Sequence, residues 1–221
     1  MSRKIPTTIK DQDLVAQRRG EIIDVATRLF LKRGFHKTSI RDIARACPFN
    51  LASLYMYVTS KEDILFLVAQ QLIEEKARAM AAVEMLDDDP AESFRTALRS
   101  YCRIVHDYRP HIRLLYRELD VLTPERREIV MASLSSVTGV FEKIVRKGID
   151  QGIFSDVEPK LVALNALFLC HLWSLHARAL RAITLNINEF FDMQSKIMLQ
   201  GMLTREPVTG RRAGSTGTRR D

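Results

Sequence analysis

The sequence predicts an all-α protein, and three observations point to this class. The 221 residues include nine glycines and seven prolines, few enough to favour long helices over short strands joined by turns. Apolar residues recur every three or four positions along most of the chain, as they do on the buried face of a helix. Cap residues followed by proline or a carboxylate mark several helix starts.

The N-terminal segment is predicted to contain an arm and a first helix. Residues 1–13 are polar and show no helical period, so we expect them to form a flexible arm. From Arg18 onward apolar residues recur at helical spacing as far as Phe30. Gly34 is expected to end this helix, because glycine is favoured just after a helix C-terminus.

Two shorter helices are predicted next. Thr38 is a favourable N-cap for a second helix. Pro48 ends that helix, because proline donates no backbone hydrogen bond and disfavours helix at the residue before it. Asn50 is expected to cap a third helix that reaches about Tyr57.

A fourth, long helix is predicted to begin after Ser60, which forms a capping-box pattern with Asp63, and to run to near Leu86. Short helices followed by a long one, with a tight turn between the second and the third, form the helix-turn-helix arrangement. We therefore expect a helix-turn-helix from Thr38 to Lys61.

The second half of the chain shows repeated helix starts. The sequence DPAE at 89–92 supplies an N-cap, a proline and a carboxylate, and TPE at 123–125 repeats this pattern. Pro110 interrupts the region between them, and the helix that follows Thr123 is expected to end near Gly152. The segment 156–159 is expected to open a strongly apolar helix.

The last predicted helix begins at Asn186, with Glu189 completing a capping box. Residues 204–221 are rich in Gly, Ser, Thr and Arg, and we expect a disordered basic tail.

Positive charge gathers at the two ends of the chain. Residues 1–65 carry twelve Lys and Arg against seven Asp and Glu, and residues 204–221 carry five against two. The region between them carries seventeen against eighteen, within a formal net charge of +7. A basic N-terminal segment suits a polyanionic partner, which charge alone leaves open between nucleic acid and an anionic membrane surface.

The three cysteines, Cys47, Cys102 and Cys170, are widely spaced and odd in number. They form neither a CxxC metal pair nor the pattern of a disulfide framework. Because each lies in an apolar helical context, we interpret them as buried structural thiols rather than as a redox sensor.

Enzymatic and membrane functions find little support in the sequence. None of the patterns GxSxG, P-loop, HExxH or GxGxxG is present, so we expect no enzyme. His171 and His176 are five residues apart, the wrong spacing for a helical metal pair, and we expect no metal or cofactor. No run of about 18 apolar residues is present, and the N-terminus lacks the apolar stretch of a secretory signal. We expect a cytoplasmic protein.

One ordered set of residues carries a family resemblance. Apolar core positions, caps and a pair of tyrosines occur in the same order as in a known DNA-binding domain: Ile22, Ala26, Leu29, Phe30, Gly34, Phe35, Thr38, Ser39, Ile40, Asp42, Ile43, Ala44, Leu54, Tyr55, Tyr57, Ser60, Lys61, Glu62 and Leu65. This stretch resembles the DNA-binding domain of TetR-type (tetracycline-repressor-like) regulators. The resemblance covers about a fifth of the chain.

The resemblance implies which residues contact DNA. Residues 50–57 would form the recognition helix in the major groove. Hydroxyls, an ammonium and helix N-termini would contact phosphates, through Thr38, Tyr55, Tyr57 and Lys61. The expected DNA-contacting residues are Thr38, Ser39, Asn50, Leu51, Ala52, Ser53, Tyr55, Met56, Tyr57 and Lys61. The alternatives are that the two tyrosines are packed aromatics and that Lys61 is a solvated first-turn lysine.

The expected recognition helix departs from the family in two respects. Pro48 stands where members usually have glycine, which leaves the orientation of the helix open. The helix also has no Arg, Lys or Gln, so Asn50 and Ser53 are its conventional donors and acceptors for base edges, besides the tyrosine hydroxyls. We therefore expect contacts with thymine methyls and DNA shape to contribute more than bidentate contacts.

By the same resemblance, residues 14–65 form the DNA-binding domain and residues 66–203 a ligand-binding and dimerisation domain. The last two helices would pair with those of a second subunit, and a twofold dimer implies a palindromic DNA operator. Polar residues in otherwise apolar helices are the candidates for ligand contact: Tyr101, Arg113, Tyr116, Arg117, His171, Trp173 and Arg178.

Around YRELDVLTPERREIV (116–130) and DQGIFSDVEPKLVAL (150–164), the C-terminal half also looks similar to domains that respond to fatty acyl-CoA thioesters or related catabolic acids. The leading hypothesis is a repressor released from a palindromic operator by a small apolar or acyl-CoA-like effector, for which an acyl-CoA or another lipid-like acid is one candidate. The alternative is a DNA-binding protein of the same fold without a small-molecule effector.

Overall fold

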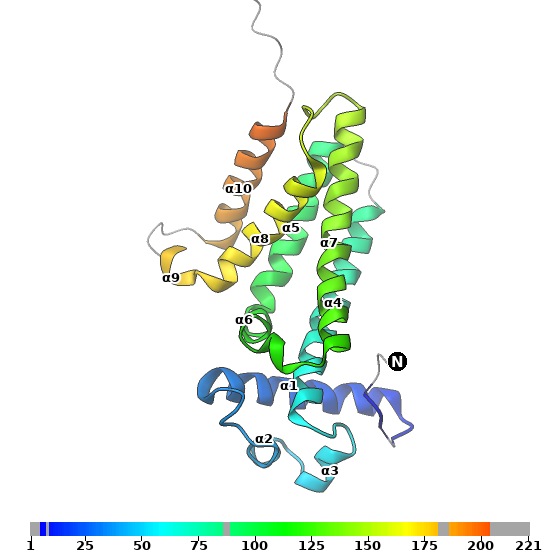
Figure 1. Cartoon of the computed structure of the whole chain (residues 1–221), viewed down its shortest axis with the longest axis vertical. Helices are drawn as coiled ribbons and strands as arrows, with labels where there is room; N and C mark the ends of the chain where they lie inside the picture. Colours follow the sequence, from blue (N-terminus) through cyan, green and yellow to red (C-terminus); the bar gives the residue numbers. More distant parts are fainter. Residues whose placement is uncertain (1–4, 8, 86–88, 181–185, 204–221) are drawn as a thin grey trace, which may run out of the picture.

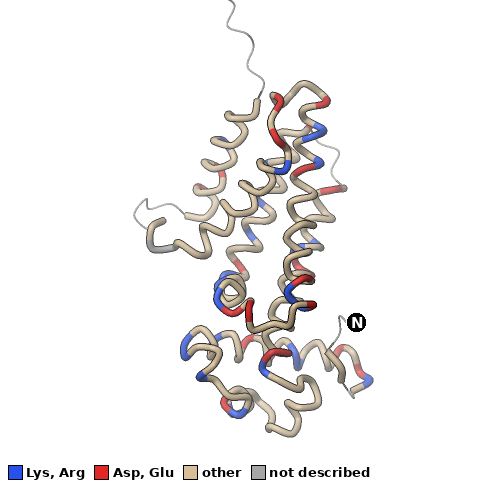
Figure 2. The backbone as a smooth tube through the Cα atoms, in the orientation of Figure 1, with Lys and Arg blue, Asp and Glu red and all other residues tan. Residues whose placement is uncertain are grey.

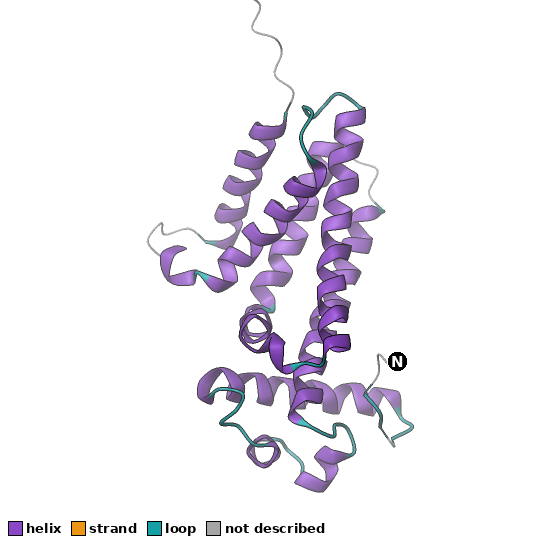
Figure 3. Cartoon of the chain, viewed as in Figure 1, coloured by secondary structure: helices purple, strands orange, loops and turns teal. Residues whose placement is uncertain are grey.

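The computed structural model describes residues 5–7, 9–85, 89–180 and 186–203, without the side chains of 177 and 178. The predicted tail 204–221 and the predicted helix end at Leu86 lie outside these residues. Within them the chain is built from α-helices joined by short loops, as Figure 3 shows, so the all-α prediction is confirmed.

The helices form a small unit at the base of the molecule and a larger bundle above it (Figure 1). The base contains the first three helices and the start of the fourth: α1 (Gln12–Arg33), α2 (Ile40–Ala46), α3 (Leu51–Tyr55) and α4 (Lys61–Glu84). The bundle contains α5 (Pro90–Asp107), α6 (Arg109–Glu118), the 3-10 helix η1 (Leu119–Val121), α7 (Pro124–Asp150), α8 (Pro159–Leu175), α9 (Ala177–Leu180) and α10 (Ile187–Met202). α4 belongs to both parts and runs unbroken through the predicted domain boundary at 65/66.

Several predicted caps are confirmed. Asn50 caps α3, Ser60 caps α4, Asp89 caps α5 and Thr123 caps α7, each by accepting backbone N–H groups of the first turn. The capping box predicted at Asn186 is also present. These starts were predictable because a cap depends on a few neighbouring residues.

The cap predicted at Thr38 is wrong, because the neighbouring Ser39 takes this position. Ser39 accepts the N–H of Asp42, and the Asp42 carboxylate accepts the N–H of Ser39 at 2.9 Å. Thr38 is 1% exposed, and its hydroxyl donates to the carbonyl oxygen of Gly34 at 2.8 Å. Gly34 ends α1 as predicted, with a φ of 88° that favours glycine.

The expectation of a flexible arm over residues 1–13 is wrong for its described part. Asp11 caps α1 by accepting the N–H groups of Asp13 and Leu14, so the helix begins six residues before Arg18. Ile5 is 3% exposed, and its carbonyl oxygen accepts a hydrogen bond from Arg19 at 2.7 Å. The N-terminal segment therefore packs against the base unit.

In the bundle, α5 packs against α4, α7, α8 and α10. An aromatic contact in the core of the bundle joins two of these helices: Phe94 of α5 packs edge to face on Phe141 of α7, with ring centroids 5.5 Å apart. Figure 2 shows that charged residues are sparse along α8, whose single charged residue is Lys160. No described helix combines the length and the apolar character needed to cross a bilayer.

The interpretation of all three cysteines as unpaired thiols is wrong for two of them. Cys102 of α5 and Cys170 of α8 are fully buried and form a disulfide across 68 residues of sequence. Their pairing depends on how α5 and α8 pack, which spacing in the sequence does not reveal. Cys47 is a free, half-buried thiol.

Candidate functional site

The first candidate site is the outer surface of α3 and its surroundings. α3 is too short to be stable alone, so it depends on packing. Leu54 is fully buried against the base unit, and Asn50 accepts the N–H of Ser53 at 2.9 Å. These two contacts fix both which face of α3 points inward and where the helix begins.

Most of the residues predicted to read DNA bases lie on the outward face of α3. Tyr55 is 47% exposed and Met56 is 41% exposed. Asn50 and Ala52 are exposed, whereas Leu51 and Ser53 are half-buried. The structure thus brings these predicted residues together on one accessible surface at the base of the molecule (Figure 1).

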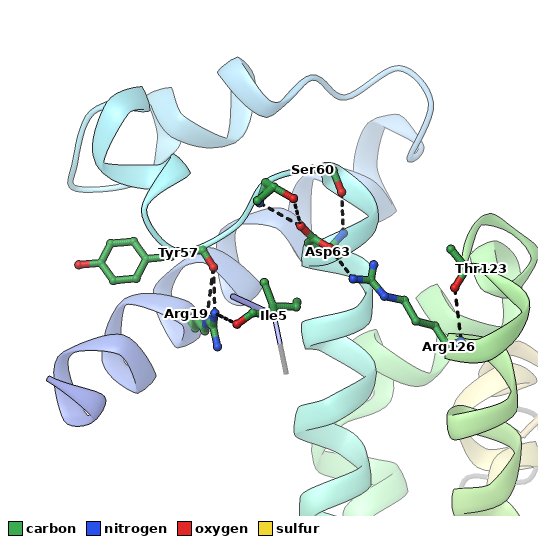
Figure 4. A network of polar contacts seen from close by, with 8 residues as sticks. Ile5, Arg19, Tyr57, Ser60, Asp63, Thr123 and Arg126 are labelled. Carbon is green, nitrogen blue, oxygen red and sulfur yellow. Dashed lines mark hydrogen bonds and ion pairs between the residues drawn. The ribbon is translucent and has the colours of Figure 1, made fainter. Parts of the chain in front are cut away.

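Tyr57, which the family resemblance places in contact with phosphates, is buried in this structure. Its side chain is 6% exposed and packs near Phe49, with ring centroids 6.2 Å apart. Its backbone carbonyl oxygen accepts hydrogen bonds from the Arg19 guanidinium at 3.1 and 3.3 Å (Figure 4). The packed-aromatic alternative therefore describes Tyr57 in this structure, while Tyr55 stays accessible.

Lys61 has an intramolecular role that sequence reasoning missed. Its ammonium donates to the carbonyl oxygen of Phe35 at 3.0 Å and lies 4.5 Å from the centroid of that ring. It is half-buried and ties the start of α4 to the turn between α1 and α2. In this structure the ammonium of Lys61 is thus hydrogen-bonded within the protein, and its contact with a phosphate stays a prediction.

A shallow hollow of about 360 Å³ lies between the start of α2, the end of α3 and the start of α4. Its lining is rich in hydroxyl groups and basic side chains and includes Lys37, Ser39, Tyr55, Thr59 and Lys61. Donors such as the Lys37 ammonium and the Tyr55 hydroxyl suit the phosphate oxygens of a DNA backbone, whereas Thr59 and Lys61 make hydrogen bonds within the protein.

A polar network connects the base unit to the bundle (Figure 4). Asp63 of α4 is 5% exposed and accepts the N–H of Thr59 at 3.0 Å and a hydrogen bond from Arg126 of α7 at 2.6 Å. Burial alone would raise the pKa of Asp63, but the hydrogen bonds from Thr59 and Arg126 outweigh it and hold that pKa below its usual value. Arg126 also lies over the ring of Phe66, 4.8 Å from its centroid.

The second candidate site is a cavity of about 260 Å³ inside the bundle. Its walls come from α4, α6, η1, α7 and α8 and are mainly apolar, with Leu72, Ile112, Leu115, Val130 and Leu134 among them. The residues at its rim are about half exposed: Tyr116, Met131 and Phe168. Such a cavity lies near the lower end of the sizes usual for small-molecule sites.

Lys76 of α4 lines this cavity although it is 4% exposed. Among the described residues, no hydrogen bond or ion pair to its ammonium is found. Burial lowers its pKa from the usual 10.5 to about 8, which leaves the group mostly protonated at neutral pH. An unpaired ammonium in an apolar cavity is costly, and an anion in the cavity would relieve that cost.

His171 of α8 links two tyrosines at the same cavity. Its Nε2 lies 2.7 Å from the Tyr101 hydroxyl, and its Nδ1 lies 2.7 Å from the Tyr116 hydroxyl. Burial, aided by the nearby charge of Lys76, lowers the pKa of His171 to about 3, so the imidazole is neutral. Burial also raises the pKa of both tyrosines, which keeps their hydroxyls protonated.

The structure gathers some of the predicted ligand residues and separates others. Tyr116 and His171 line the cavity, with Tyr101 behind His171. Arg113 and Arg117 are exposed on α6, and neither lines the cavity. Trp173 faces elsewhere and donates from Nε1 to Nδ1 of His106 at 2.9 Å. The side chain of Arg178 lies outside the described residues.

Sequence reasoning missed Lys76, although a signal was present. Lys76 lies four residues after Leu72 and four before Met80, both of which are buried on the same face of α4. A lysine in the middle of such an apolar stripe is unusual for a solvated side chain.

Comparisons with known proteins find matches for both halves of the chain. Residues 22–68 match the family described as bacterial regulatory proteins, tetR family. Residues 87–174 match the family described as tetracyclin repressor-like, C-terminal domain.

Two relatives and one solved structure illustrate the similarity. The chain is 28% identical over 175 residues to the HTH-type transcriptional regulator HbdR of Aromatoleum sp. (strain CIB), covering 79% of this chain and 76% of HbdR. It is 31% identical over 160 residues to the HTH-type transcriptional repressor KstR2 of Rhodococcus jostii (strain RHA1), covering 66% of this chain and 76% of KstR2. The crystal structure of AibR with isovaleryl coenzyme A and operator DNA matches with a TM-score of 0.68 at 22% identity, covering 81% of this chain and 97% of AibR. At that identity the likeness to AibR concerns the fold.

Proposed function

The chain belongs to the TetR family of DNA-binding transcriptional regulators, and from this premise we propose that it is a dimeric repressor that leaves its operator when a small molecule binds the bundle. DNA binding in this proposal is supported by the accessible face of α3, which lies beside a hollow rich in hydroxyl groups and basic side chains. The buried, unpaired Lys76 in the bundle cavity favours a small-molecule effector over the alternative without one.

In this proposal α3 enters the major groove of DNA. Asn50 and Ser53 meet base edges, and apolar side chains such as Met56 meet thymine methyl groups. Tyr55 and Ser39 contact phosphates at the hollow between α2, α3 and α4. Because Thr38, Tyr57 and Lys61 are engaged within the protein, we assign them to positioning this surface rather than to direct contact.

The proposed dimer forms through α8 and α10. α8 exposes an apolar stripe at helical spacing, comprising Leu161, Leu164, Phe168 and Leu172. α10 exposes Met193 and Ile197. The two helices already meet where Trp173 packs on Phe190, with ring centroids 5.2 Å apart. A second copy is the partner we propose for this face, as a twofold dimer would place two α3 helices about 34–36 Å apart on successive turns of DNA.

For release, the effector must have a higher affinity for the conformation that cannot bind the operator than for the conformation that can. The solved structure of AibR contains isovaleryl coenzyme A. For this chain we propose, more generally, that the effector is an apolar acid or a derivative of one. A regulator of this kind works where its operator is, so we propose the cytoplasm as its location.

Selection of DNA from a random library with the full-length protein tests the proposed function. We expect enrichment of a palindromic site and an affinity for it that falls steeply between about 50 and 200 mM salt, as release of counterions from phosphates requires. Tyr55→Ala is expected to weaken binding to all sequences, whereas Met85→Ala at the exposed end of α4 serves as the control. Failure to enrich any sequence, or binding that is indifferent to salt, would contradict the proposal.

A further inference from the structure

The bundle cavity has two polar features that point to the same kind of ligand. We propose that it binds a small apolar molecule with one carboxylate, which is received by the ammonium of Lys76 and the hydroxyl of Tyr116. This proposal rests on the proposed function, because it names the chemical class of the effector. Of the two candidate effectors, an acyl-CoA and another lipid-like acid, it favours the free carboxylic acid.

The first feature is the ammonium of Lys76. The side chain comes from α4, is 4% exposed and lines the cavity without a partner among the described residues. An ammonium with three donors in an apolar setting is stabilised by an anion that accepts from it. A carboxylate supplies one negative charge, which matches the one lysine at this cavity.

The second feature is the direction of the hydrogen bonds around His171, that is, which group donates and which accepts. The hydroxyl of Tyr101 is fully buried with Nε2 of His171 as its hydrogen-bond partner, and leaving its proton without an acceptor would be costly. Tyr101 therefore donates to Nε2. A neutral imidazole with an acceptor at Nε2 carries its proton on Nδ1, which then donates to the oxygen of Tyr116.

This arrangement leaves the hydroxyl proton of Tyr116 free to point into the cavity. Tyr116 lines the cavity and is 49% exposed, so its proton has room to turn toward a ligand. Lys76 and Tyr116 then both present donors to the same space, and an acceptor such as a carboxylate satisfies both. A ligand that is itself a cation would meet an unfavourable charge.

The size and lining of the cavity select the rest of the ligand. The remaining wall is apolar and the volume is about 260 Å³, which suits a short or medium hydrocarbon group rather than a whole coenzyme A ester. The exposed arginines of α6, Arg113 and Arg117, do not line the cavity, so several phosphates would find no positive charge there besides that of Lys76.

Calorimetric titration of the full-length dimer tests the proposal without DNA. The probes are straight-chain, branched and aromatic monocarboxylic acids of four to ten carbons (about the size of the cavity), each with its primary amide and its coenzyme A thioester. We expect at least one acid to bind about tenfold or more tightly than its amide, since a hydrogen-bonded charge pair is lost in the amide. If every acid fails to bind, or if amide or thioester binds as tightly as the acid, the proposal is overturned.

Variants locate the binding site. Lys76→Met keeps the volume of the side chain and removes its charge, and it is expected to abolish the preference for acid over amide. Tyr116→Phe removes one donor without altering charge and is expected to weaken acid binding by about three- to tenfold. Lys160→Met, at an exposed position of α8, is expected to change nothing. Tyr116→Phe keeps the test decisive if Lys76→Met does not fold, and unchanged binding in Tyr116→Phe and any folded Lys76→Met protein would contradict the assignment.

The same acid is then titrated into the complex with operator DNA, so that the two proposals fail separately. An acid that binds the free protein through Lys76 but leaves the DNA complex intact supports this site and contradicts release by an effector. Release by the thioester with no response to the acid contradicts the carboxylate proposal and leaves release by an effector in place.

Discussion

At the residue scale, the buried ammonium of Lys76 lowers the stability of the folded protein. Its burial among apolar side chains holds its pKa near 8, whereas the unfolded chain has the usual value of 10.5. The folded protein therefore binds this proton more weakly than the unfolded chain does. A shift of this size corresponds to a cost of about 3 kcal/mol below pH 8. Proteins commonly accept such a cost where the group serves a ligand.

Replacement of Lys76 tests this cost directly. The unfolded chain binds more protons between pH 8 and 10.5, so the contribution of Lys76 to stability becomes less unfavourable as the pH rises through this window. Lys76→Met is expected to raise the free energy of unfolding by about 3 kcal/mol at pH 7, and this advantage is expected to shrink toward pH 10.5. Urea denaturation at a series of pH values measures both quantities, with Lys160→Met as the exposed control. An advantage that does not change with pH would argue against a buried charged lysine.

The two tyrosines near α3 make a second residue-scale comparison. Tyr55 is 47% exposed and Tyr57 is 6% exposed. Tyr55→Ala is therefore expected to weaken DNA binding and to leave stability within about 0.5 kcal/mol. Tyr57→Ala is expected to cost about 3 kcal/mol of stability because it leaves a cavity beside Phe49, whereas Tyr57→Phe is expected to retain both folding and DNA affinity. Melting curves measure the packing role of Tyr57, and binding isotherms measure the DNA contact of Tyr55. A large loss of DNA affinity in Tyr57→Phe would show that the Tyr57 hydroxyl contacts DNA.

At the scale of elements, the sequence predicted those features that depend on near neighbours. The starts of α5 and α7 follow from Asp89 and Thr123, because each cap lies within a few residues of the N–H groups that it accepts. The start of α1 at Gln12, capped by Asp11, was missed because the apolar period becomes clear only later in the helix.

The second site was predicted only in fragments. Tyr101, Tyr116 and His171 come from α5, α6 and α8, so their hydrogen bonds depend on how three helices pack. Each of the three was predictable as a polar residue in an apolar helix, but the hydrogen bonds between them were not predictable from neighbouring residues. The disulfide between α5 and α8 was missed for the same reason.

α7 connects the two candidate sites. Arg126 near its start holds Asp63 at the start of α4, and about one turn later Val130 and Met131 line the cavity. Asp63 also accepts the N–H of Thr59, in the loop that follows α3. A ligand that displaces α7 would therefore move a contact that positions α4 and the loop beside it (Figure 4).

Arg126→Met tests this connection, with the adjacent Arg127→Met as a matched control because Arg127 pairs with the 98% exposed Asp120. Without Arg126 the buried carboxylate of Asp63 keeps, among the described residues, its hydrogen bonds from Thr59. We therefore expect a loss of about 2–3 kcal/mol of stability, against less than about 1 kcal/mol for the control. Asp63 has a lowered pKa, so its stabilising contribution is present above its usual pKa and is lost as the pH falls through the folded value; this acid dependence is expected to weaken in Arg126→Met.

The same variant separates binding from coupling. We expect Arg126→Met to bind the ligand of the bundle cavity as the wild type does, because Arg126 does not line that cavity. The ratio of operator affinities without and with ligand is expected to fall toward one. A wild-type ratio in Arg126→Met would show that coupling follows another route.

At the scale of the whole molecule, the cavity and the proposed dimer face share one residue. Phe168 lies at the rim of the cavity and also belongs to the exposed apolar stripe of α8. A second subunit placed on this stripe would cover part of the rim. Dimerisation would then help to exclude water from the ligand, which strengthens the contacts of a carboxylate with Lys76.

The proposed dimer is tested by charge placed on its apolar face. Leu161 and Ile197 are each 57% exposed, so replacing both with Glu is expected to leave the subunit folded while making association unfavourable. We expect the double variant Leu161→Glu/Ile197→Glu to be a monomer in light scattering, with an unchanged circular dichroism spectrum. Met85→Glu, at a position that is 86% exposed, is expected to remain a dimer. Since one subunit engages only half of a palindrome, operator affinity is expected to fall by about 100-fold or more. A double variant that stays dimeric and retains its affinity would show that the two DNA-binding units are joined through a different face.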